Sequence, residues 1–188
     1  MSILKNNIRC AIETLRALES MESQVNAAAE LVGNCLTQGG KLLVCGNGGS
    51  AADGADFSTE YTCRFMGDRR PYPAMNLSAG GSLITATAND YSFDEVFSRQ
   101  VRAFGQKGDV LVGISTSGNS RNILCAIEEA NSKGISSIAL LGKDGGKIRG
   151  TATLDLIVPC EITARIQEAH KFILHTICEL VEPRLERD

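Results

Sequence analysis

Two short loops rich in glycine and serine are the clearest candidates for chemistry in this sequence. The first, Asn47 to Ser50, follows the apolar run Lys41 to Cys45. The second, Ser115 to Ser120, follows the apolar run Asp109 to Ile114. A helix is expected directly after each loop, and the unpaired backbone N–H groups of a helix start favour an anion. The loops therefore predict phosphate binding, with helix capping by Ser and Asn as the alternative.

Common nucleotide-binding motifs are missing from the sequence. No lysine follows the second loop as it would in a P-loop, and no G-x-G-x-x-G occurs. A nucleoside triphosphate or a dinucleotide is therefore not indicated.

Two carboxylates and two histidines are the next candidates. Asp56 and Glu60 are four residues apart in the helix expected after the first loop, so both lie on one face. Such a pair either faces solvent or, beside a ligand crevice, binds a cation or shares a proton. In the last helix His170 falls in the apolar arc and is expected in the core, whereas His175 points out of it. His175 is either solvated or an acid, a base or a metal ligand.

The elements that must position these side chains alternate along the chain. Apolar residues recur with helical spacing from Leu4 to Leu18 and from Val25 to Cys35. Short apolar runs bounded by turns predict five strands, at residues 41–45, 74–77, 109–114, 137–141 and 154–158. A long helix is expected from Thr163 to about Glu182. The predicted class is α/β, with a doubly wound five-stranded parallel sheet, two N-terminal helices and a long C-terminal helix.

Composition narrows the classes of function. The chain has 188 residues and 43% hydrophobic content, which suits one domain spanning 1–188. The formal charge is −3 with no long run of either sign, so nucleic acid is not an expected partner. No apolar stretch approaches the roughly 20 residues that cross a bilayer, and the first residues lack the layout of a signal peptide. We expect a cytoplasmic protein that does not bind membranes.

Four motifs together carry a resemblance to a known family. They are C-G-N-G-G-S-A-A-D at 45–53, A-N-D at 88–90, G-I-S-T-S-G-N-S at 113–120 and R-I-Q-E-A-H-x4-H at 165–175. In this order the chain closely resembles the phosphoheptose isomerases, which are sugar isomerase (SIS) domain proteins. The likeness runs over nearly the whole chain and implies a flavodoxin-like SIS fold.

The resemblance implies an enzyme, an aldose–ketose isomerase. Its reaction would convert sedoheptulose 7-phosphate to D-glycero-D-manno-heptose 7-phosphate, the first step toward the activated heptoses of lipopolysaccharide or capsule. It also implies a homotetramer with active sites at subunit contacts, in which the helices of residues 1–38 pack between subunits.

The resemblance also implies roles for individual residues. Glu60 and His175 match the acid/base pair. Positions that match substrate-binding residues are Asn47, Gly48, Gly49, Ser50, Glu60, Asn89, Asp90, Ser115, Thr116, Ser117, Ser120 and Gln167.

A Zn²⁺ ion in each active site is the cofactor that the resemblance implies. Glu60, Gln167 and His175 match metal ligands, and the fourth position, usually histidine in the family, is Asp56 here. Two carboxylates, one amide and one imidazole form a harder donor set than usual, so Mn²⁺ and Fe²⁺ are alternatives to Zn²⁺.

Two other functions compete with this one. A non-catalytic SIS adaptor that binds the bacterial replication initiator has lost the acid/base positions, whereas Glu60 and His175 are present here. An isomerase or sensor for another sugar phosphate would use the same loops, because loops of this kind do not specify the length of the sugar.

Overall fold

Parallel strands form the centre of the structure, a computed structural model that describes residues 2–186. Residues 1 and 187–188 of the expected domain lie outside the described residues. Within the described chain one sheet has five strands in the order β2-β1-β3-β4-β5, all paired in parallel. The strands are β1 (Leu42–Gly46), β2 (Ala74–Asn76), β3 (Val110–Ser115), β4 (Ser136–Gly142) and β5 (Leu154–Val158). The prediction of a five-stranded parallel sheet is confirmed.

Successive side chains of the central strands pack into two separate cores. Leu42 and Val44 of β1 join the core on one face of the sheet, while Leu43 and Cys45 join the core on the other. All four are fully buried. A strand covered on both faces has no polar positions, which is why these runs are continuously apolar in the sequence.

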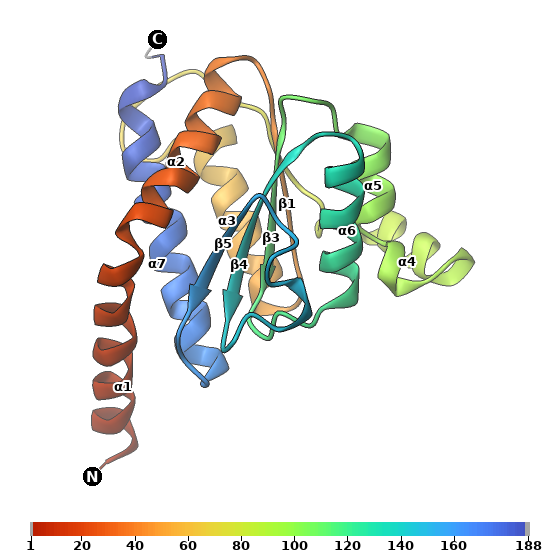
Figure 1. Cartoon of the computed structure of the whole chain (residues 1–188). Coiled ribbons are helices and arrows are strands. Elements are labelled where there is room, and N and C mark those ends of the chain that lie inside the picture. Colours follow the sequence, from red (N-terminus) through yellow and green to blue (C-terminus); the bar gives the residue numbers. More distant parts are fainter. Residues whose placement is uncertain (1, 187–188) are drawn as a thin grey trace.

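Helices cover both faces of the sheet (Figure 1). One face carries α2 (Glu22–Thr37), α3 (Gly49–Thr62) and α7 (Thr163–Val181), and α1 (Ile3–Ala17) packs along α7. The other face carries α4 (Gly81–Asp90), α5 (Ser98–Phe104) and α6 (Arg121–Ser132). Short 3₁₀ turns are η1 (Leu18–Met21), η2 (Phe93–Glu95), η3 (Gly146–Ile148) and η4 (Glu182–Arg184). The doubly wound arrangement predicted from the sequence is therefore confirmed.

The region between β2 and β3 contains two helices that the sequence reading did not predict. In α4 only Thr87 is buried, and α5 has just seven residues. Neither presents the long apolar stripe by which a helix is recognised in a sequence. By contrast, the last helix ends at Val181, close to the stop predicted near Pro183. Within residues 2–186 no helix combines the length and the apolar content needed to cross a membrane.

A buried arginine joins the C-terminal ends of α3 and α7. Arg69 is 4% exposed, and its Nε lies 3.0 Å from Glu182 Oε2, just beyond the end of α7. Its guanidinium also donates to the carbonyl oxygens of Glu60 and Tyr61 in the last turn of α3. The second carboxylate oxygen of Glu182 accepts from the backbone N–H of Gly67 at 3.1 Å. Every strong polar group of this buried pair is thus satisfied, and the two helix ends are held together.

Candidate active site

The two glycine and serine loops lie next to each other at the carboxyl edge of the sheet. β1 and β3 are neighbours, and the register pairs Gly46 with Ile114 at the ends of these strands. From β1 the chain continues to β2 on one side, whereas β3 lies on the other side. This is the switch point of the sheet, where open α/β domains form a crevice for ligands.

Reciprocal hydrogen bonds fix the crevice. The amides of Asn47 and Asn122 each donate to the other at 2.9 Å, which joins the first loop to the helix after the second loop. Within the second loop the hydroxyls of Ser115 and Ser120 lie 2.9 Å apart. Gly118 has a φ of +63°, and a Cβ there would collide with the carbonyl oxygen of Gly145. Only glycine therefore lets the loop take this tight path.

Helix capping does not account for these loops. Gly48 and Ser120 occupy the N-cap positions of α3 and α6. Gly48 has no side chain to cap with, and the Ser120 side chain makes no capping hydrogen bond. The hydroxyl of Ser120 is directed at Ser115 instead. The N-terminal N–H groups of the two helices thus have no side-chain cap, and phosphate binding by these loops stays a prediction.

Helices α3 and α7 run parallel to each other in a fixed register. At their start Gly49 lies against Gln167, so closely that a Cβ on Gly49 would collide with the Gln167 amide. Further along, Asp53 contacts Lys171. In each of these two pairs the residues are 118 positions apart in the sequence. Glu60 and Cys178 are separated by the same number of positions. Burial raises the pKa of the Cys178 thiol to about 12, and the negative charge of the Glu60 carboxylate adds to the rise.

The register sets the two acid/base candidates at similar heights along the partly exposed seam where α3 and α7 face each other. This seam, called the groove between α3 and α7, comprises Asp56, Glu60, Gln167, Lys171 and His175. His175 is one turn before Cys178, and the shared offset of 118 residues sets Glu60 at the level of that cysteine. Both side chains are half-buried, and the His175 ring packs on Phe65 with ring centroids 5.9 Å apart. His175 is therefore not on a fully solvated face.

A lysine occupies the middle of the same groove. The ammonium of Lys171 lies 3.1 Å from Asp53 Oδ1 and also bonds Asp56 Oδ2. Burial lowers the pKa of Lys171, but the hydrogen bonds to the two aspartates outweigh it and leave the pKa above its usual value. The lysine is thus a fixed positive charge. Asp56, considered above as a partner of Glu60 in holding a cation, has this ammonium as its partner.

The remaining predicted substrate-binding residues lie in two separate places. Ser50, Thr116, Ser117 and Gln167 belong to the two loops or face them. Asn89 and Asp90 are exposed at the end of α4, on the opposite face of the sheet from α7, and the Asn89 amide donates to Asp90 at 2.8 Å. The structure thus does not bring this pair into the groove between α3 and α7.

Two residues with a place in the site were missed by the sequence reading. Asn122 is a buried amide in the first turn of α6, and Lys171 lies on α7 four residues after Gln167 and four before His175. The spacing of Lys171 was a usable signal, because residues four apart share a helix face. The pairing of Asn122 with Asn47 had no signal, since it joins residues 75 positions apart.

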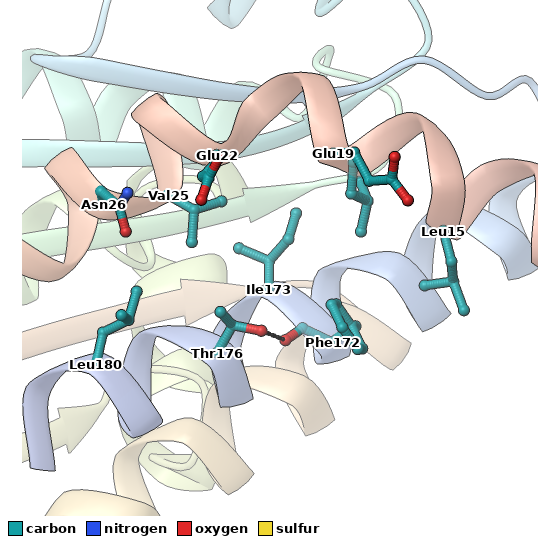
Figure 2. Close-up of a pocket in the computed structure, with 10 residues that line it drawn as sticks. Leu15, Glu19, Glu22, Val25, Asn26, Phe172, Ile173, Thr176 and Leu180 are labelled. Atoms are coloured by element: carbon teal, nitrogen blue, oxygen red, sulfur yellow. Dashed lines mark hydrogen bonds between the residues drawn. The ribbon is translucent and has the colours of Figure 1, made fainter.

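A mostly apolar cavity lies on the other side of α7. A groove of about 640 Å³ runs between α1, η1 and α2 on one side and α7 on the other (Figure 2). Phe172, Thr176 and Leu180 line it, whereas Gln167, Lys171 and His175 belong to the groove between α3 and α7. Its lining is mostly apolar, with Glu19 and Glu22 at the rim, and offers nothing for sugar chemistry.

The fold and the paired loops define a sugar isomerase domain, and the chain matches the SIS domain family over residues 8–142. It is 50% identical over 183 residues to a phosphoheptose isomerase of Geobacter sp. (strain M21), covering 97% of this chain and 95% of that protein. The phosphoheptose isomerase structure from Neisseria gonorrhoeae is 43% identical, with a TM-score of 0.85, covering 97% of this chain and all of the other. The one from Francisella tularensis is 35% identical, with a TM-score of 0.89 and the same coverage.

The chain therefore belongs to the phosphoheptose isomerases of the SIS domain family, and it is a sugar-phosphate isomerase. Membership of this family suggests a metal cofactor, which the side chains at the expected ligand positions would have to hold. Asp56, Glu60, Gln167 and His175 are the ligands that the resemblance implied. The ammonium of Lys171 stands among them and bonds Asp56. Within residues 2–186 no three His, Cys, Asp or Glu side chains are arranged to hold a metal, so the donor set does not fit one.

His170 is fully buried, as predicted, and this makes the fold sensitive to acid. Its Nε2 lies 2.9 Å from the carbonyl oxygen of Leu141, so the neutral ring donates there. Burial lowers the pKa of His170 below its usual 6.5, although the bond to Leu141 opposes this. Below pH 6.5 His170 binds a proton in the unfolded chain but stays neutral in the folded chain. The free energy of unfolding should then fall by up to about 1.4 kcal/mol per pH unit for this group.

We expect His170→Gln to flatten the fall in stability between neutral pH and about pH 5.5. Chemical denaturation at several pH values measures the free energy of unfolding directly. His175→Gln changes the only other histidine and is the control. An unchanged pH slope in His170→Gln would assign the acid sensitivity to other groups.

Proposed function

We propose that this isomerase converts sedoheptulose 7-phosphate to D-glycero-D-manno-heptose 7-phosphate and thereby starts the synthesis of activated heptoses. The names of the relatives support a phosphorylated heptose as substrate. The observation that carries the proposal is the register of α3 and α7. It aligns Glu60 and His175 along one groove that begins at the phosphate-type loops.

The length of the groove suits a long sugar phosphate. Gly49 and Glu60 are eleven residues apart in α3, which is about 16 Å along a helix axis. The substrate carries its phosphate at C7 and its reacting carbons at C1 and C2. An extended heptose phosphate is shorter than this distance, so side chains at both ends would reach inward to it, whereas a triose phosphate would leave a much wider gap.

The reaction moves a proton between two carbons through an enediol. A base takes a proton from C1 of the ketose while the C2 oxygen gains one. A proton then returns to C2 as the C1 hydroxyl loses its own, which leaves an aldehyde at C1. In this proposal Glu60 and His175 take up and return these protons, since both carry groups suited to acid/base work. Closing water out of the groove would strengthen their effect.

The phosphate lies in this proposal at the carboxyl edge of β1 and β3. The hydroxyls of Ser115, Ser117 and Ser120 and the N-terminal dipole of α6 supply donors and a favourable field there. Gln167, held against Gly49, reaches the sugar from the other side. Binding the phosphate remotely would help to orient C1 and C2 at the acid/base pair.

We also propose that the chain is one SIS domain that assembles into a homotetramer through its helices of residues 1–38. The support is an exposed apolar stripe along α1, in which Leu4 is 69% and Ile8 50% exposed. α1 also extends past the carboxyl edge of the sheet, away from the body of the chain (Figure 1). Apolar stripes of this kind usually mark a contact between proteins. Asn89 and Asp90 would then face the site of a neighbouring copy.

Loss of either acid/base group should abolish turnover. In an assay that follows sedoheptulose 7-phosphate to its aldose isomer, we expect Glu60→Gln and His175→Ala each to lower kcat by about 10²- to 10⁴-fold. Glu168→Gln, an exposed change on the same helix, is the control. A variant that keeps more than a tenth of the wild-type rate would remove its residue from the mechanism. Wild-type protein that turns over a different ketose phosphate faster would favour the alternative substrate.

Weakening the serine loop should act on binding. We expect Ser117→Ala combined with Ser120→Ala to raise KM well above the wild-type value while the fold is retained, because both hydroxyls would donate to the phosphate. Steady-state kinetics measure KM, and thermal unfolding checks the fold. Ser132→Ala, at the other end of α6, is the control. Unaltered KM in the double variant would place the phosphate elsewhere.

Light scattering should show four chains for the wild-type protein. Ile8→Glu combined with Ile12→Glu places charges on the exposed stripe of α1 and should dissociate the assembly. Glu13→Gln changes another exposed side of the same helix and should leave it intact. A wild-type monomer at micromolar concentration would contradict the proposed assembly.

A further inference from the structure

The ammonium of Lys171 lies among the side chains that were expected to hold a metal. On α7 it lies one turn after Gln167 and one turn before His175. On α3 its partners are Asp53 and Asp56, with Glu60 one turn beyond. Three of the four residues expected to hold a metal thus lie within one helical turn of Lys171 or are bonded to it, and Glu60 lies one turn beyond Asp56 on α3.

The two aspartates hold this ammonium in a particular direction. Asp53 is a mostly buried anchor at 8% exposure, and Asp56 closes the pair from the exposed side. An ammonium has three N–H donors, of which these carboxylates take two. The third donor stays available to a molecule in the groove. One oxygen of Asp53, Oδ2, is buried without a partner in the described chain, so the cluster has unused polar capacity inside the site.

We propose that Lys171 is the resident cation of this active site and takes the place of a divalent metal. This inference rests on the acid/base function proposed above for the same groove. The ammonium donates its third N–H to the substrate oxygen on which negative charge develops as the enediol forms. It supplies the electrostatic stabilisation that a reaction of this kind requires. Asp53 and Asp56 are positioning residues that hold the ammonium between Gln167 and His175.

Charge balance supports the exchange of a metal for a lysine. A bound divalent ion beside a fixed ammonium would suffer repulsion, and both would compete for the Asp56 carboxylate. The lysine already holds one carboxylate oxygen of each aspartate. A neutral ligand in place of Asp56 would deprive the ammonium of a partner, which makes aspartate the suitable residue at this position.

Metal content is the first test. We expect protein dialysed against a chelator to keep its full rate and to contain no stoichiometric metal by elemental analysis. A rate that is lost on chelation and restored by stoichiometric uptake of Zn²⁺ or Mn²⁺ would overturn the proposal.

Kinetics of lysine variants are the second test. We expect Lys171→Met to lower kcat by about 10²- to 10³-fold with a smaller effect on KM, as found when a donor to a developing oxyanion is removed. Lys171→Arg should restore part of the rate. Lys41→Met is a matched control, because Lys41 pairs with Asp109 at 2.6 Å at the opposite edge of the sheet. It should lower thermal stability and leave kcat unchanged.

The outcomes separate the two proposals. A wild-type kcat in Lys171→Met, together with an inactive Glu60→Gln, would overturn the role of the lysine and leave the acid/base mechanism standing. An active Glu60→Gln would instead overturn the acid/base mechanism itself.

Zinc binding by variants gives a readout that does not depend on activity. Asp56→His supplies an imidazole but keeps the ammonium, and we expect it to take up no zinc in calorimetric titration. Combining Asp56→His with Lys171→Met removes the ammonium and should create a zinc site. Stoichiometric zinc in Asp56→His alone would show that the ammonium does not exclude the metal and would overturn the proposal.

Discussion

The parallel register of α3 and α7 is the constraint on which the site depends. Each helix packs on the same face of the sheet, and three contacts, two of them polar, fix the position of one helix along the other. Gln167 lies against Gly49 at the start, Lys171 bonds two aspartates in the middle, and Arg69 joins the ends. A slip of one residue would turn side chains by about 100° and part Glu60 from His175.

Polar groups hold this register because apolar packing alone is permissive. Leu, Ile and Ala side chains tolerate small shifts, whereas a buried charge left without its partner is strongly destabilising. Arg69 and Asp53 are both less than one-tenth exposed and both bond across the boundary between the two helices. The free energy cost of burying these charges is offset only in the observed register of α3 and α7. Any other register would leave the charges unpaired, so these charges specify the observed one.

The sequence was sufficient for the sheet and for the position of the loops. Strands covered on both faces are continuous apolar runs, and each loop is marked by glycine and serine directly after such a run. The sequence was insufficient for α4 and α5. Helix α4 is mostly exposed and α5 is only seven residues long, so neither shows a periodic apolar pattern. The sequence reading also missed the role of Lys171, because an exposed-looking lysine acquires a function only when Asp53 and Asp56, more than a hundred residues earlier, face it. Spacing within one helix carries no information on such a pairing.

The identity of residue 56 and the charge at residue 171 are one physical feature. The position of Asp56 usually carries a histidine in the family that the sequence resembles, and histidine is a neutral donor that suits a metal bound together with anionic ligands. An ammonium has only donors and requires acceptors, and a charged carboxylate binds it more strongly than a neutral imidazole does. Aspartate offers a negative charge and two acceptor oxygens, and Lys171 uses one of them. In this proposal the cation is the Lys171 side chain, so its attraction to Asp53 and Asp56 contributes to the free energy of folding. The site then needs no metal ion from solution.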